Sequence, residues 1–193
     1  MAISVCVFCG SRYGVDPRHR VAAARLGELL GAAGARLIYG GGHVGLMGAV
    51  ADAAMAAGGE VLGLIPAHLL EREVGHRAIT ELIVTEDMFE RKRQMIERAD
   101  AFVILPGGLG TLDELLEVIT LRQLACHDKP IVLINLGGFW DPFVALVDRV
   151  IDKGFAGPGS RTLYRIVNSV DEALPALGIA QPAAAPLRLA QGD

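Results

Sequence analysis

Short apolar runs alternate along the chain with longer segments in which apolar residues recur every three or four positions. The short runs are typical of buried strands and the periodic segments of amphipathic helices. Strands are predicted at residues 3–8, 36–39, 60–65, 79–84, 101–105, 131–136 and 164–167. Helices are predicted at residues 17–33, 46–57, 87–99, 111–125, 142–153 and 170–177.

This alternation predicts an α/β fold of the Rossmann kind, with an open, doubly wound, mostly parallel sheet and helices on both faces. Residues 66–77 form an irregular stretch that is long for a simple connection, and such loops are often functional. We expect residues 1–177 to form one domain. Residues 178–193 are rich in Ala, Pro and Gln without periodicity, so we expect a mobile tail.

The 193 residues suit one domain, and 52% hydrophobic with 21% charged residues is a globular composition. The 18 basic and 22 acidic side chains give a net charge of −4, which argues against a basic nucleic-acid-binding surface. No apolar run has the length of a membrane span, and the N-terminus lacks the basic region of a signal peptide. We therefore expect a cytoplasmic protein with no nucleic-acid or membrane partner.

No metal or cofactor is predicted from the cysteines and histidines. Cys6 and Cys9 match CxxC, but positions i and i+3 of a strand point to opposite faces. Together with Cys126 they suit a reducing compartment better than a disulfide framework. The five histidines are scattered without the spacing of metal ligands.

Three glycine-rich turns, at residues 9–12, 40–45 and 106–111, each follow a predicted strand. In an open parallel sheet, ligands bind beyond the carboxyl ends of the strands. Glycine permits close backbone approach, and a helix N-terminus attracts anions, so a phosphate suits these turns. None is a Walker loop or a complete GxGxxG fingerprint, and tight turns also use glycine where no ligand binds.

The third turn leads directly into Thr111, Leu112, Asp113 and Glu114, a pattern that has two interpretations. It matches a capping box, with Thr111 as N-cap and Glu114 at the third helical position. Alternatively, Glu114 lies within one helical turn of a phosphate site, where a carboxylate acts as general base or stabilises a cationic sugar.

Two predicted helices carry unusual faces. In helix 87–99, Lys92 falls within an apolar stripe and Arg91 lies at the edge of that stripe. Both side chains are therefore predicted to face inward or toward a cleft. Alternatively, Lys92 only covers apolar surface with the methylene groups of its side chain. Helix 111–125 is apolar on two sides, which predicts a subunit interface, most simply a two-fold dimer, unless the helix is buried within one larger domain. The expected sheet-facing side is Leu112, Leu115, Leu116 and Ile119, and the other side is Val118, Leu121 and Leu124.

Taken together, the motifs resemble the LOG family, the cytokinin riboside 5′-monophosphate phosphoribohydrolases, which are often mislabelled as lysine decarboxylases. The resemblance covers about residues 3–177. The motifs are Phe8-Cys9-Gly10-Ser11, Gly40-Gly41-Gly42 with Gly45-Leu46-Met47-Gly48, Arg72-Glu73, Met88-x-x-Arg91-Lys92-x-x-Met95, and Pro106-Gly107-Gly108-x-Gly110-Thr111-x-x-Glu114. Arg12 departs from the family's usual second serine, which leaves the phosphate role of Ser11 and Arg12 open.

The resemblance implies hydrolysis of the N-glycosidic bond of AMP or N6-substituted AMP, releasing the base and ribose 5-phosphate. It implies a homodimer with its sites near the interface. It also implies that Arg91 and Glu114 are the catalytic pair. The candidate substrate-binding residues are Gly10, Ser11, Gly41, Gly42, Glu73, Met88, Lys92, Gly107, Gly108, Leu109, Gly110, Thr111, Asp113 and Thr120.

Two other functions remain open at this point. A carrier of a nucleotide or of molybdenum cofactor, or a nucleotide sensor, would bind a phosphorylated ligand at the same turns without cleaving it. A carboxylate beside a phosphate favours the enzyme, because a carrier gains little from that repulsion. Pyridoxal-phosphate decarboxylation is disfavoured, because the chain is short for such an enzyme and offers only Lys92, Lys129 and Lys153 for a Schiff base.

Overall fold

A computed structural model describes residues 2–70 and 74–180, in which strands and helices alternate as the sequence predicts. The strands are β1 (Ser4–Phe8), β2 (Arg36–Tyr39), β3 (Val61–Pro66), β4 (Glu81–Thr85), β5 (Ala101–Ile104), β6 (Ile131–Ile134) and β7 (Arg165–Val167). The α-helices are α1 (Arg18–Ala32), α2 (Gly45–Ala56), α3 (Met88–Arg98), α4 (Leu109–Gln123), α5 (Asp141–Asp152) and α6 (Ala173–Ala176).

The strands form one parallel sheet in the order β4-β3-β2-β1-β5-β6-β7. The chain builds outward from β1 to the β4 edge, then returns to place β5 beside β1, with Val7 opposite Val103. The strand order therefore reverses at β1, and the topological switch point lies between β1 and β5. Open parallel sheets bind their ligands at this point.

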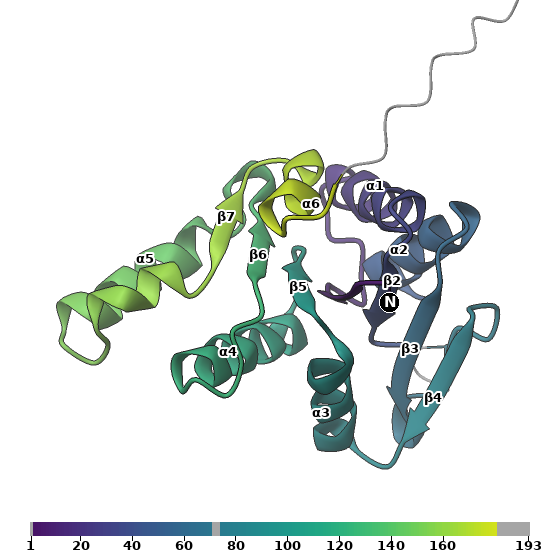
Figure 1. Ribbon diagram of the computed structural model, residues 1–193, viewed down its shortest axis with the longest axis horizontal. Helices are drawn as coiled ribbons and strands as arrows, with labels where there is room; N and C mark the ends of the chain where they lie inside the picture. Colours follow the sequence, from purple (N-terminus) through teal and green to yellow (C-terminus); the bar gives the residue numbers. More distant parts are fainter. Residues whose placement is uncertain (1, 71–73, 181–193) are drawn as a thin grey trace, which may run out of the picture.

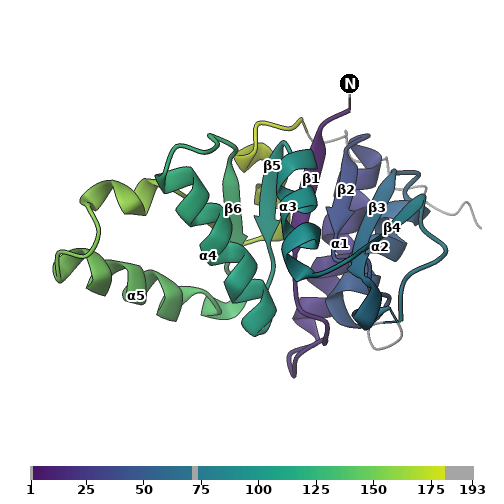
Figure 2. The same ribbon diagram turned by 90° about the horizontal axis from the view of Figure 1, so that it is seen from below.

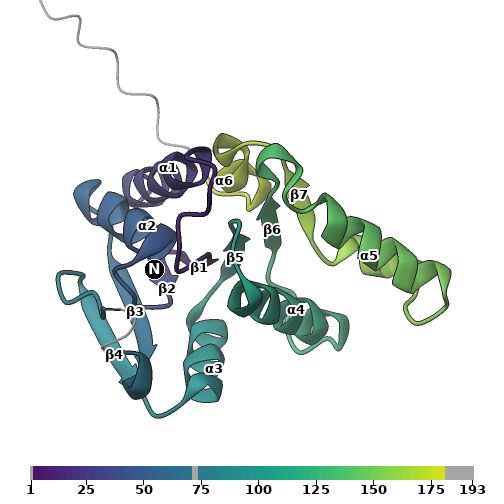
Figure 3. The ribbon, with the colours of Figure 1, turned by 180° about the vertical axis from the view of Figure 1, so that it is seen from behind.

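Helices cover both faces of the sheet, which confirms the doubly wound Rossmann-like prediction. Helices α1, α2 and α6 lie on one face and α3 and α4 on the other, while α5 extends beyond the β7 edge (Figure 1, Figure 3). Alternate residues of β1 belong to two separate cores, with Val5 and Val7 on the α1 side and Cys6 and Phe8 on the α3 side. Burial on both faces explains the continuous apolar runs of the central strands.

Predicted and observed elements differ mainly at their ends. Helix α4 begins at Leu109, two residues before the predicted start. The predicted final helix begins as a 3-10 turn at Val170–Glu172 and continues as α6. The irregular stretch before β4 includes the 3-10 turn Ala67–Leu69. Most of the predicted mobile tail, residues 181–193, lies outside the described residues.

None of the helices in the described parts of the chain combines the length and the apolar character that a bilayer crossing needs.

Candidate active site

The three glycine-rich turns lie together at the carboxyl ends of the strands, as predicted. They follow β1, β2 and β5, which are neighbours in the sheet, so their carboxyl ends lie side by side. The Gly10 amide donates to the Pro106 carbonyl over 3.1 Å, which joins the β1 and β5 turns. The Leu46 amide donates to the Gly10 carbonyl over 3.0 Å and so joins the start of α2 to the same place.

A cavity of about 940 Å³ opens beside these turns. Its walls include several of the predicted substrate-binding residues of the β1 and β5 turns, together with residues that were not among the predicted binding residues. The predicted members are Gly10, Ser11, Gly107, Gly108 and Leu109, and the added ones include Tyr13, His19, Leu46 and Phe139. Arg12 also lines the cavity.

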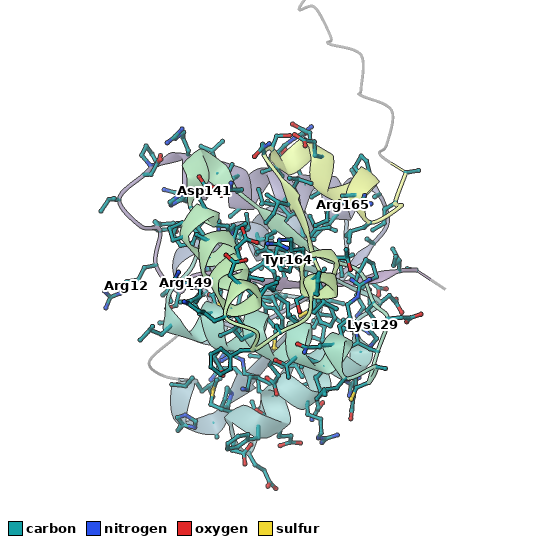
Figure 4. All side chains as sticks on the ribbon, turned by 90° about the vertical axis from the view of Figure 1, so that its left-hand side faces the viewer. Arg12, Lys129, Asp141, Arg149, Tyr164 and Arg165 are labelled. Carbon is teal, nitrogen blue, oxygen red and sulfur yellow. The ribbon has the colours of Figure 1, made fainter. Side chains whose placement is uncertain are left out.

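A second cavity, of about 570 Å³, lies at the opposite ends of the strands, where β6 and β7 begin. Tyr164 and Arg165 are among its lining residues. Figure 4 shows Arg12 at one side of the molecule and Arg165 and Lys129 toward the other. We place the candidate site at the first cavity, because ligands of such sheets bind at the carboxyl ends of the strands.

The N-terminus of α4 is open to an anion. Gly108 is the N-cap, in extended conformation, and no side chain caps the helix. Gly108, Leu109 and Gly110 are all exposed, and a Cβ added at Gly108 or Gly110 would meet no atom within 4 Å. The first turn of the helix therefore has an exposed backbone and no capping side chain, which is the arrangement that binds phosphate at helix N-termini.

The capping-box interpretation of Thr111 and Glu114 is wrong. Thr111 is the third residue of α4 rather than its N-cap, so Glu114 lies in the second turn, away from the free amides. Both side chains are on the buried face of the helix. The Thr111 hydroxyl packs against Gly107, where an added Cβ would come within 2.1 Å of Oγ1. The T-x-x-E spacing therefore places a hydroxyl and a carboxylate beneath the β5 turn instead of at the helix end.

Arg91 is a buried cation held by the β2 turn. Its side chain is on the inner face of α3, and the residue is only 5% exposed. Nη2 donates to the Gly40 carbonyl over 3.2 Å, and Nη1 lies 3.6 Å from the Met88 sulfur. A Cβ at Gly40 would lie 2.0 Å from Nη2, so only glycine leaves room for the guanidinium. Gly40 is thus a positioning residue that the sequence analysis quoted in a motif but did not select.

Glu114 and Arg91 bring opposite charges to the same end of β1. Burial raises the pKa of the Cys6 and Cys9 thiols; the Glu114 carboxylate raises both further, and the Arg91 guanidinium opposes that effect. Both groups therefore lie within electrostatic range of the same two thiols, one in β1 and one in the turn that follows it. Glu114 is 8% exposed, so its charge acts in a medium that screens poorly. The structure therefore brings together the two residues that the resemblance implies are catalytic.

Lys92 links α3 to α4. Its Nζ lies 2.9 Å from Asp113 Oδ2 and 2.9 Å from Glu117 Oε2, and the residue is 8% exposed. Burial disfavours the charged ammonium, but the bonds to Asp113 and Glu117 outweigh that effect, so the Lys92 pKa is raised. Lys92 faces inward, as predicted, and pairs with carboxylates rather than only covering apolar surface. Glu117 completes this bridge and was missed, because charge alone does not distinguish it from a solvated residue.

Other predicted residues lie farther from the cavity or outside the description. Gly41 and Gly42 are buried: Gly41 adopts φ +74° and packs near Leu64 and Ile65, and Gly42 bridges to Gly75. Thr120 is exposed on α4. Glu73 lies outside the described residues, so its predicted contact with substrate stays a prediction.

The two-sided character of α4 is confirmed, but two assignments to its sides, those of Leu116 and Val118, are wrong. Val118 is buried with Leu115 and Ile119, whereas Leu116, predicted to face the sheet, is 49% exposed. The exposed side also carries Leu109 at 85% and Leu124 at 66%. The shift arises because the residues that face the sheet also include the polar Thr111 and Glu114, which a purely apolar pattern ignores.

The sequence of this chain is similar to those of known proteins. A family model described as "Possible lysine decarboxylase" matches residues 47–177. A probable cytokinin riboside 5′-monophosphate phosphoribohydrolase of Oryza sativa subsp. japonica, LOGL2, is 42% identical over 173 residues, which are 90% of this chain and 71% of that protein. The Arabidopsis thaliana cytokinin riboside 5′-monophosphate phosphoribohydrolase LOG7 is 46% identical over 159 residues, covering 82% of this chain and 73% of its own.

Similar solved structures include two proteins that handle molybdenum cofactor. The molybdenum cofactor binding protein of the phototrophic bacterium Rippkaea orientalis superposes with a TM-score of 0.71 at 21% identity, over 92% of this chain and 96% of that one. The Moco carrier protein of Chlamydomonas has a TM-score of 0.70, also at 21% identity and with the same coverage. At this identity the likeness establishes the shared fold and nothing about ligands.

Proposed function

Since this chain belongs to the LOG family of cytokinin riboside 5′-monophosphate phosphoribohydrolases, we propose that it hydrolyses the N-glycosidic bond of a nucleoside 5′-monophosphate. The substrate class is AMP or N6-substituted AMP, and the products are the free base and ribose 5-phosphate. The observation that carries this proposal is a pair of buried, oppositely charged side chains, Arg91 and Glu114, with Glu114 in the second turn of a helix whose N-terminus is uncapped. The carboxylate suits the hydrolytic step, and the free helix amides suit a phosphate.

The 5′-phosphate is bound at the start of α4. The exposed backbone of Gly108 and Gly110 offers the amides, and the helix dipole favours the negative charge there. Arg12, on the wall of the cavity, adds a positive charge in place of the family's usual second serine. Fixing the phosphate positions the ribose and reduces the entropy that must be lost before reaction.

The carboxylate of Glu114 acts at the anomeric carbon. It orients or deprotonates the attacking water, and its negative charge stabilises the oxocarbenium character that develops as the base leaves. The water oxygen bonds to C1′ as the bond from C1′ to the base nitrogen breaks, and the base takes up a proton. Arg91, fixed by the Gly40 carbonyl, holds Glu114 or the sugar hydroxyls in place.

A homodimer is the assembly that the exposed face of α4 supports. Leu109, Leu116 and Leu124 lie on this face, and Phe89 of α3 is 78% exposed. Figure 2 shows α3, α4 and α5 on the same side of the molecule. Exposed apolar residues gathered over adjacent helices are typical of subunit contacts, and a two-fold contact of α4 with its copy satisfies them most simply.

We further infer one nucleotide-binding domain over residues 1–177 and a cytoplasmic location. The free state of Cys6, Cys9 and Cys126 agrees with a reducing compartment.

Turnover of a small substrate panel tests the proposal. Purified protein is incubated with AMP, isopentenyl-AMP and adenosine, and free base and ribose 5-phosphate are separated by chromatography. We expect equimolar base and ribose 5-phosphate from at least one nucleotide, and none from adenosine, which lacks the phosphate. Tight binding of nucleotides without release of base would overturn the hydrolase and favour a carrier or sensor.

A further inference from the structure

A second cluster of polar side chains lies outside the candidate active site. It consists of His43, Asp52 and His76. The Nε2 atom of His76 lies 2.9 Å from Asp52 Oδ1, and the Nε2 atom of His43 lies 3.6 Å from Asp52 Oδ2. One donor atom from each residue lies within 4.8 Å of the others, so all three side chains point at one small volume. Although the sequence positions of the two histidines lack the spacing of metal ligands, the fold brings their side chains together.

Backbone contacts between two loops bring the histidines together. The His43 amide donates to the Val74 carbonyl over 2.9 Å, and the His76 amide donates to the Gly41 carbonyl over the same distance. Gly42 and Gly75 form an isolated antiparallel bridge between these bonds. The imidazole rings consequently stack, with centroids 4.2 Å apart and planes 25° apart.

We propose that His43, Asp52 and His76 form a binding site for a divalent transition metal ion of the Zn²⁺ class. Two imidazoles and one carboxylate are a ligand set that Zn²⁺ uses in proteins, with bonds of about 2.0–2.2 Å. Tetrahedral ligands at that distance stand roughly 3.3 Å apart, as the bond lengths require. The observed 2.9 Å and 3.6 Å run to different oxygens of Asp52, and all three donor atoms lie within 4.8 Å of one another, so the side chains must draw together to bind the ion. The stacked imidazole rings must also turn relative to each other, so that both Nε2 lone pairs point at the ion.

The surroundings of the three side chains combine access from solvent with one buried ligand. The side chains of Asp52 and His43 are 58% and 50% exposed, whereas that of His76 is 4% exposed. A buried ligand fixes the site and two exposed ones let a hydrated ion enter, leaving a coordination position for water. Nε2 of His76 must be unprotonated to bind the ion, so the ring proton is then on Nδ1. A protonated Nδ1 no longer accepts the 3.4 Å hydrogen bond that the Ala78 amide donates to it.

A bound ion would clamp three segments that are separate in sequence. His43 belongs to the loop after β2, Asp52 to α2, and His76 to the loop that leads to β4. The first loop begins at Gly40, whose carbonyl holds Arg91. The ion therefore stabilises the frame of the candidate active site without taking part in its chemistry.

Calorimetric titration of the tag-free, chelator-treated full chain with ZnCl₂ tests this site. We expect one Zn²⁺ per chain and a higher melting temperature in its presence, because an ion that binds only the folded state stabilises it. His43→Ala and Asp52→Asn should each weaken binding at least tenfold, since even outer-shell partners of metal ligands typically contribute about 10–100-fold.

The variants and their control separate this site from adventitious binding. Asp52→Asn keeps an oxygen for the hydrogen bond from His76, so its loss of affinity reports ligation rather than folding. His68→Ala removes an exposed histidine outside the cluster and should leave the affinity unchanged. Absence of Zn²⁺ binding by the wild-type chain, or equal binding by wild type, His43→Ala and Asp52→Asn, would overturn the proposal.

Discussion

Replacing Gly40 by alanine should disable the site while leaving the fold in place. The added Cβ would lie 2.0 Å from Arg91 Nη2 and 3.0 Å from the Met47 sulfur. Both atoms are the far ends of flexible side chains, so the protein can accommodate the methyl group by moving them. The guanidinium then leaves the Gly40 carbonyl, and Arg91 loses the contact that fixes its position.

The size of the effect follows from the contact that is lost. A hydrogen bond to a charged group contributes about 1.5–3 kcal/mol. If that amount is lost from the transition state, kcat falls roughly ten- to a hundredfold. The free energy of unfolding should fall by about 1–3 kcal/mol, because a buried guanidinium is left with fewer partners. Such a loss is well within what most domains tolerate.

Steady-state base release and urea unfolding, measured on the same preparations, test this prediction. Gly157→Ala is the matched control, because an added Cβ there meets no atom within 4 Å and the backbone is not in the left-handed region. The control should keep wild-type kcat and stability. A Gly40→Ala variant that is folded and keeps kcat within twofold of wild type would refute the positioning of Arg91 by the β2 turn.

Two further predictions concern assembly and pH. Leu116→Glu should convert the proposed dimer to monomers in light scattering without unfolding, because this side chain is exposed in the single chain, whereas Val21→Glu on α1 should not. Burial lowers the pKa of His127, and the charges of Lys129 and Arg122 lower it further. As the pH falls, His127 is therefore protonated in the unfolded chain before it is protonated in the folded chain. Stability should therefore be full above a pH of about 6.5 and fall as the pH drops below it. A His127→Gln variant with the same slope in urea unfolding between pH 6.5 and 5 would contradict this.

The sequence predicts the fold well because buried parallel strands and amphipathic helices have different periods. Continuous apolar runs such as β5 and β6 are unambiguous once glycine turns bound them. Strands that alternate with helices form a parallel sheet, in which all the carboxyl ends lie on one side. The three glycine-rich turns that follow strands are therefore predicted to lie on that side. The sequence determines the ends of helices and strands less well. Nothing in the amino-acid sequence distinguishes Gly108 from Thr111 as the N-cap of α4.

The site is less predictable, because its contacts join residues that are distant in the chain. Helical periodicity places Arg91 and Lys92 on an inner face, but only the fold shows that Gly40 holds one and Glu117 the other. The His43 and His76 pair has no local signature at all, because two loops bring the rings together. Spacing rules for metal ligands detect sites built within one segment and miss a site of this kind.

The most direct test of the account is base release from AMP and isopentenyl-AMP by wild-type protein and Glu114→Gln in parallel. The amide has nearly the shape of the carboxylate but neither its charge nor its basicity. General base catalysis typically contributes about 10²–10⁴-fold, so the variant should lose at least a hundredfold in kcat while its circular dichroism spectrum stays that of the wild type. Near-normal turnover by a folded Glu114→Gln variant would contradict the catalytic role of this carboxylate.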